Sequence, residues 1–254
     1  MCVVARIPPA PLRPDRGSMH TTLAPHSATR LVAPSTSSTI AFVALLIALV
    51  ARQVFAIWEG YDGSMTYDDL RRLGDAYWPM NLLVFGPAYA IGFTAQAILA
   101  WRLGRGRGRV VTWLGATLLL VGGTLFALVA TAHSLPYDWA SHRGILDEAT
   151  GRAVVEAFDT VGTASLVPYI LAAQAVIALG ALVTAVGARL SGTLPTWVLV
   201  AVILLVLAFA LVPSAPGTAI TIGLALIQTV VWAVLGWFGF RHAQRGAGAV
   251  RTGE

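Results

Sequence analysis

The sequence predicts an all-α fold: a polytopic membrane protein with six transmembrane helices and both termini on the cytoplasmic side. Hydrophobic residues make up 57% of the 254 residues and charged residues only 11%, against about 25% charged in a typical soluble domain. Six apolar stretches approach or exceed the roughly 20 residues that a helix needs to cross a bilayer. The loops between these stretches alternate in the sign of their charge. These three observations together favour a membrane bundle over any soluble class.

The predicted elements leave no segment large enough for a separate globular domain. Residues 1–38 are rich in Pro, Ser, Thr and Arg and lack apolar periodicity, so we expect a disordered cytoplasmic tail. Residues 39–239 form the six-span bundle, and residues 240–254 form a second cytoplasmic tail. The six spans are expected at residues 39–58, 80–101, 110–132, 161–187, 196–213 and 217–239.

The first span has two readings. A basic tail, an apolar run and the small residues around Val54-Phe55-Ala56 resemble a cleaved export signal. However, the run begins far from the N-terminus and Arg52 would lie beside the cleavage site, so a retained anchor is favoured. Met19 is an alternative translation start.

The distribution of arginine predicts the orientation, since arginine near span ends marks the cytoplasmic side. The two tails, the 102–109 turn and the turn after the fourth span hold twelve of the 17 arginines but only two of the 12 acids. The loops at 59–79 and 133–160 hold the remaining acids, so we place these loops on the extracytoplasmic side. Seven of the eight tryptophans fall near predicted span ends, where the headgroup layer favours indole.

Both acidic loops are predicted to contain helix. In the first, Thr66 is suited to cap a short helix whose positive end is complemented by Asp68 and Asp69. In the second, apolar residues recur every fourth position from Ile145, so we expect a helix that lies on the membrane or packs beneath the first loop. Gly151 is expected to interrupt this helix, with Thr150 capping a second one.

Arg52 is the only charged residue inside a predicted span, and such residues are functional candidates by default. Glu59 lies seven residues further on, on the same helical face and near the outer end. We therefore expect Arg52 to reach outward or to pair with an acid of the outer loops. A closed site for an anion or a lipid headgroup is the alternative.

Three glutamines place one amide in each of spans two, four and six: Gln96, Gln174 and Gln228. Small residues surround them at helix-contact spacing, and interhelical amides stabilise membrane bundles. We expect these glutamines to join helices. A polar path for a solute through the bundle is the alternative, although Gln96 lies deeper toward the cytoplasm than the other two.

Several chemistries find no support in the sequence. The chain has no lysine and a single cysteine, Cys2, which excludes P-loop phosphate binding, Schiff-base cofactors and thiolate metal clusters. We weighed His133, Asp138 and His142 as zinc ligands, but their spacing matches no metal motif, so we expect no metal and no cofactor. The run from Arg102 to Arg109 could bind anionic lipid, yet marking the topology is sufficient to explain it, and we expect no nucleic acid. The lysine-free, arginine- and alanine-rich composition is typical of a GC-rich bacterial genome.

The leading functional hypothesis is a non-enzymatic interaction or accessory subunit of the cell membrane. Its partners would be the lipid bilayer and either another membrane protein or a second copy of the chain. The alternative is a small-solute transporter or channel that uses the polar residues of spans two, four and six. An outer-face enzyme using His133 or His142 is a third hypothesis, based only on the presence of titratable groups.

Overall fold

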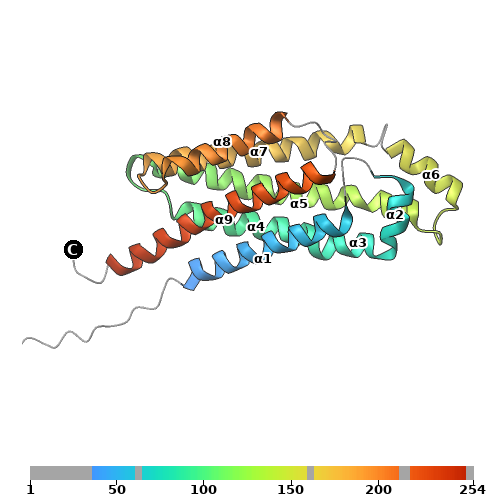
Figure 1. Cartoon of the computed structure of the whole chain (residues 1–254), viewed down its shortest axis with the longest axis horizontal. Helices are drawn as coiled ribbons and strands as arrows, with labels where there is room; N and C mark the ends of the chain where they lie inside the picture. The colour runs from blue at the N-terminus through green and yellow to red at the C-terminus, as the bar shows by residue number, and fades with distance from the viewer. Residues whose placement is uncertain (1–35, 61–64, 159–162, 212–217, 250–254) are drawn as a thin grey trace, which may run out of the picture. The chain divides into compact units, whose positions relative to one another are not determined.

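The computed structural model describes residues 36–60, 65–158, 163–211 and 218–249, and within these ranges it contains helices and turns but no strand. The predicted all-α, multi-pass class is therefore confirmed. Residues 1–35 of the predicted N-terminal tail, which include the Met19 start, and residues 250–254 of the predicted C-terminal tail lie outside the described residues. The described residues all belong to one compact unit, in which the long helices run side by side (Figure 1). Among these residues, five helices are long and apolar enough to cross a membrane: Thr36–Glu59, Tyr67–Trp101, Gly106–Ser141, Leu166–Leu190 and Ala219–Arg245.

The elements follow one another along the chain with short connections. The first half contains α1 (Thr36–Glu59), α2 (Tyr67–Leu73), η1 (Gly74–Ala76), α3 (Tyr77–Met80), η2 (Asn81–Phe85) and α4 (Gly86–Trp101). The second half contains η3 (Gly106–Gly108), α5 (Arg109–Ser141), α6 (Glu148–Ala157), α7 (Thr163–Leu190), α8 (Thr196–Leu211) and α9 (Thr218–Ala249).

Helices α1, α5 and α9 extend beyond their predicted spans. Helix α1 begins at Thr36, whereas the predicted end of the fifth span at residue 213 lies outside the described residues. Helix α5 continues through Pro136 to Ser141, and α9 continues to Ala249, both past their predicted ends. Helix α8 has 16 residues, about 24 Å at the helical rise, which is shorter than the other five candidates. Hydropathy locates the apolar part of a helix, whereas the helical hydrogen-bond ladder can extend into the headgroup layer.

The entry to the second span contains a π-helical turn, η2, immediately before Pro87. Proline has no amide N–H and its ring crowds the carbonyl one turn earlier, so a wider turn relieves the strain. The Asn81 side chain donates to the Tyr77 carbonyl oxygen at 3.0 Å, which satisfies a backbone acceptor beside the irregular turn.

Glycines allow α5 and α7 to approach closely along most of their length. Gly108, just before α5, faces Gly187 of α7, Gly115 faces Gly180, and Gly122 packs against Val176 and Ile177. A Cβ atom on Gly115 would overlap the backbone nitrogen of Thr184, and one on Gly187 would overlap that of Thr112. Since lipid does not drive helices together by the hydrophobic effect, close packing of small residues is what holds such a pair.

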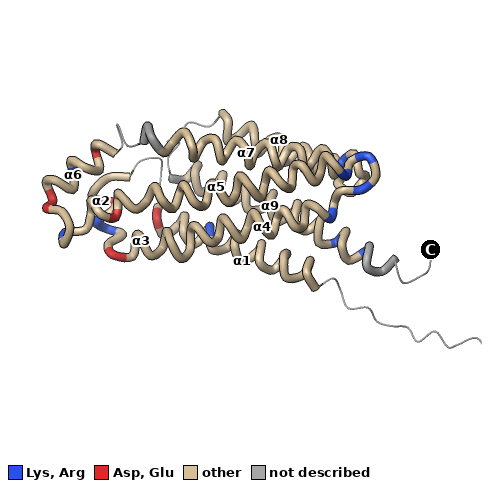
Figure 2. Tube along the Cα trace, turned by 180° about the vertical axis from the view of Figure 1, so that it is seen from behind, with Lys and Arg blue, Asp and Glu red and all other residues tan. Residues whose placement is uncertain are grey.

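The two ends of the bundle carry different charges (Figure 2). The described acids gather at the end that holds α2, α3 and α6, together with a few arginines. The opposite end, at the α4–α5 turn, the α7–α8 turn and the last turns of α9, has only arginine among its described charged residues. The loops that alternate in charge along the sequence therefore lie at opposite ends of the bundle, acidic loops at one end and basic turns at the other.

The acidic loops fold against each other over a small hydrophobic cluster. Thr66 caps α2, as predicted, and it also forms a capping box with Asp69, which was not predicted. The cluster beneath them joins α2 and α6 to the end of α5 and consists of Met65, Tyr67, Leu70, Tyr77, Tyr137, Ala140 and Val155.

The predicted interruption of the second loop helix is wrong. Asp147, not Thr150, caps α6, and Gly151 lies inside the helix. Gly151 is buried where a Cβ atom would overlap the Ala140 carbonyl oxygen, so it permits close packing on α5 rather than ending α6. The predicted stripe of apolar residues at every fourth position does not form the buried face, since its first member, Ile145, is 54% exposed. Val155 contributes the buried apolar contact instead.

Candidate functional site

Arg52 lies buried in the bundle, with 8% of its surface exposed. One of its guanidinium nitrogens, Nη2, donates to Gln228 Oε1 of α9 at 2.7 Å. Its Cζ lies 4.1 Å from the ring centroid of Tyr89 on α4. The expectation that Arg52 reaches outward is therefore wrong, because an amide and an aromatic face hold the guanidinium between helices.

A second polar residue of α1 extends this contact, and sequence reasoning missed it. Gln53 Nε2 donates to the Ala225 carbonyl oxygen at 2.9 Å and to Thr229 Oγ1 at 2.6 Å. The adjacent polar pair Arg52-Gln53 of α1 thus meets the adjacent polar pair Gln228-Thr229 of α9. The signal in the sequence was the occurrence of two neighbouring polar residues in each of two spans.

A small cavity lies beside Arg52, with a volume of about 10 Å³. Its polar lining comes from Arg52, Tyr89, Gln96 and Trp232. Gln96 Oε1 and Nε2, Arg52 Nε and Trp232 Nε1 are buried without a hydrogen-bond partner among the described residues. A space of this size admits about one water-sized group, so it is too narrow to pass a solute.

The four predicted intramembrane residues divide into two sets. Arg52, Gln96 and Gln228 come together where α1, α4 and α9 meet. Gln174 is exposed on the surface of α7, on the same stretch as Tyr169 and Leu171, which are 64% and 58% exposed. The polar residues of spans two, four and six therefore do not line one cavity.

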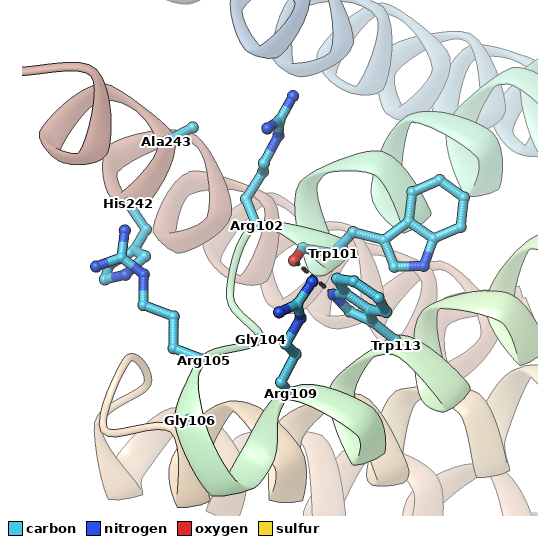
Figure 3. A pocket seen from close by; sticks show the side chains of 9 residues that line it. All are labelled: Trp101, Arg102, Gly104, Arg105, Gly106, Arg109, Trp113, His242 and Ala243. Carbon is cyan, nitrogen blue, oxygen red and sulfur yellow. Dashed lines mark hydrogen bonds between the residues drawn. The ribbon is translucent and has the colours of Figure 1, made fainter. Parts of the chain in front are cut away.

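A larger pocket of about 400 Å³ opens at the arginine-rich end (Figure 3). Arg109 Cζ lies 4.2 Å from the ring centroid of Trp113, and Trp113 Nε1 donates to the Trp101 carbonyl oxygen at 3.2 Å. The Arg105 side chain lies beside His242 of α9 in Figure 3. The residues that line the pocket are Trp101, Arg102, Gly104, Arg105, Gly106, Arg109, Trp113, His242 and Ala243. Sequence reasoning identified the arginine run but not the contribution of His242, which is distant in the chain.

The histidines weighed as zinc ligands do not assemble into a metal centre among the described residues. The His133 ring packs edge-on against Tyr137, with 5.3 Å between ring centroids. His142 Nδ1 lies 3.5 Å from Asp75 Oδ1. In the part of the chain that the structure describes, no three His, Cys, Asp or Glu side chains are placed to hold a metal ion.

Charged groups at the acidic end of the bundle join α2 and α6. Arg152 donates to both carboxylate oxygens of Asp68, at 3.0 and 2.7 Å, and also to Glu148. The hydrogen bonds that Arg152 donates to these two carboxylates raise its pKa above its usual range. The Thr150 amide and hydroxyl donate to Asp147 and lower the pKa of that carboxyl.

Comparison with known proteins does not extend these observations, since no family model, curated protein or solved structure matches the chain.

Proposed function

We propose that this chain is an integral protein of the cell membrane that crosses it six times, with both termini in the cytoplasm. Helix α8 begins next to the turn in which Ser191 accepts a hydrogen bond from the Arg105 amide at 3.0 Å. Helix α9 ends beside the same turn, where His242 reaches the basic pocket. Helix α8 must therefore carry the chain back along the bundle, which favours an even number of crossings. The arginine-only end favours the cytoplasm as its location.

Within that arrangement, we propose that the protein is a non-enzymatic interaction or accessory subunit. The observation that carries this proposal is the exposure of Gln174 near the middle of α7. An amide facing hydrocarbon without a partner is unfavourable by roughly 1–3 kcal/mol. Gln228 avoids that cost by binding Arg52, whereas Gln174 has no described hydrogen bond within the chain. A transmembrane helix of another membrane protein would provide the donor and acceptor that Gln174 needs.

A photo-crosslinking amino acid at position 174 tests this proposal in intact membranes. We expect one discrete adduct whose mass identifies the partner, or a second copy of the chain. Val186 provides the matched control, because it is exposed on the same helix but apolar. Gln174→Leu should abolish co-purification of that partner while leaving the protein folded. A chain that remains monomeric and gives no adduct at position 174 would contradict the proposal.

Transport is the second candidate, because Arg52 and Gln96 carry buried polar atoms without a hydrogen-bond partner among the described residues. A solute route there would require the cavity of about 10 Å³ to widen. If a solute route passes there, Gln96→Leu and Gln228→Leu should abolish flux into vesicles. Gln174→Leu should leave that flux unchanged, since Gln174 lies outside the cavity. Normal flux in the first two variants, or no flux for any solute tested, would eliminate this candidate.

A further inference from the structure

The pocket at the arginine-rich end concentrates positive charge without a described counter-ion. Arg102, Arg105 and Arg109 all line it. In the described part of the chain, no ion pair joins any of these three guanidinium groups to a carboxylate; the pairs lie at the acidic end. Like charges held together in this way attract anions.

The start of α5 adds to the attraction. Arg109 is the first residue of this 33-residue helix, which has no acid in its first turn, and Arg105 precedes the 3-10 turn η3 that leads into it. That end carries the positive charge of the helix dipole, which disfavours cations and favours anions. An anion bound here would therefore offset both the mutual repulsion of the arginines and the uncompensated dipole.

Other lining groups suit a phosphate oxygen in size and chemistry. His242 Nε2 is buried without a described hydrogen-bond partner. The pocket volume of about 400 Å³ falls in the usual range for small-ligand sites. Guanidinium groups bind phosphate oxygens with strong, charge-assisted hydrogen bonds. Trp101 and Trp113 at its edge are 38% and 41% exposed, as is typical of side chains in the headgroup layer.

We propose that this pocket is a binding site for a phosphate group, carried by an anionic phospholipid headgroup or by a small soluble phosphate. Arg105 and Arg109 would donate directly to the phosphate oxygens, and His242 would complete the site from α9. This proposal is independent of the partner surface at Gln174, which lies outside the pocket.

Titration of the purified full chain with phosphatidylglycerol, followed by native mass spectrometry, tests the site. Arg105→Gln should weaken lipid binding about fivefold, the factor that corresponds to about 1 kcal/mol per basic residue near an anionic headgroup. The Arg105 backbone, not its side chain, bonds to Ser191, so the variant should preserve the turn. Arg107→Gln is the matched control, because Arg107 is exposed in the same turn but does not line the pocket.

A second arm distinguishes the two sources of phosphate. Inorganic phosphate is added alone and in competition with the lipid, and phosphatidylcholine serves as the zwitterionic comparison. Binding of phosphatidylglycerol over phosphatidylcholine supports a lipid headgroup, and binding of inorganic phosphate alone supports a soluble ligand, provided that Arg105→Gln weakens either one. Equal effects of Arg105→Gln and Arg107→Gln, or binding of neither phosphatidylglycerol nor inorganic phosphate, would overturn the proposal.

Discussion

Replacing Gln228 by leucine should destabilise the bundle more than the loss of an ordinary interhelical hydrogen bond does. The reason is that the donor of the lost hydrogen bond is a charged guanidinium group. Gln228 Oε1 accepts a 2.7 Å hydrogen bond from Arg52, whose side chain is 8% exposed. Without this acceptor the guanidinium stays charged and buried, stacked only on Tyr89. A hydrogen bond to a charged group contributes roughly 1.5–3 kcal/mol, against about 0.6 kcal/mol for an average interhelical bond in a membrane. We therefore expect Gln228→Leu to lower the free energy of unfolding by about 2 kcal/mol.

The double variant Arg52→Met/Gln228→Leu should be more stable than Gln228→Leu alone. Removing both partners eliminates the buried charge and replaces it with an apolar contact of similar size, an exchange that is often neutral or stabilising. In a double-mutant cycle, the loss of stability in the double variant should therefore be clearly smaller than the sum of the losses in the two single variants.

Unfolding of the purified protein in mild detergent, followed by tryptophan fluorescence, measures these differences. Gln174→Leu is the control, because it removes the same amide from an exposed position and should change the free energy of unfolding by less than about 0.5 kcal/mol. If Gln228→Leu is as stable as the native chain, or if the double variant loses the sum of the two single effects, the buried pair does not behave as argued.

Three further predictions concern other parts of the chain. Gly115→Leu should separate α5 from α7 and cause loss of folded protein, because even the Cβ atom of the new side chain would overlap Thr184. Gly223→Leu is the control and should be tolerated, since nothing lies within 4 Å of a Cβ atom there. Size-exclusion profiles in detergent distinguish the two outcomes. The pKa of Asp147 is lowered in the folded chain. Its cap therefore stabilises α6 at pH values above the ordinary carboxyl pKa of 3.8, and this stabilisation disappears as the pH falls through the lower pKa of the folded state. A spin label on α6 should therefore become more mobile in acid. Asp147→Asn, which caps without titrating, should reduce this response, and the part that remains comes from protonation of the Asp68 carboxylate that binds Arg152. An equal acid response in both proteins would contradict this account. Arg152→Gln should release α6 from α2 and raise the same label's mobility at neutral pH, because Arg152 binds carboxylates on both helices; unchanged mobility would show that the apolar cluster alone holds them.

Hydropathy and arginine placement predicted where the spans lie and how charge separates, because both depend on single residues meeting lipid or water. The π turn before Pro87 and the extra turns of α5 and α9 were not predictable in this way. They depend on local backbone geometry and on helices continuing beyond the hydrocarbon layer. The α6 cap shows a related limit: Asp147 and Thr150 are both good capping residues, and the packing of Gly151 against α5 decides between them.

The sequence predicted which residues belong to the candidate site, but it did not predict which of them contact one another. Arg52, Gln96 and Gln228 stood out as polar groups in apolar spans, yet the sequence does not state which helices adjoin. Arg52 was expected to reach outward or to pair with an acid of the outer loops, and instead it meets Gln228 from α9. Gln174 shows the converse case, since an identical residue type in an equivalent span faces outward.

The threading of the chain is tested most directly by cysteine labelling in intact cells with a maleimide that cannot cross the membrane. Cys2→Ser provides a cysteine-free background. Single cysteines then replace Arg107 at the arginine-rich end and Ala149 at the acidic end, both of which are exposed. We predict labelling at position 149 in intact cells and at position 107 only after permeabilisation. Labelling at position 107 in intact cells, with position 149 protected, would contradict the orientation and the function assigned to each end.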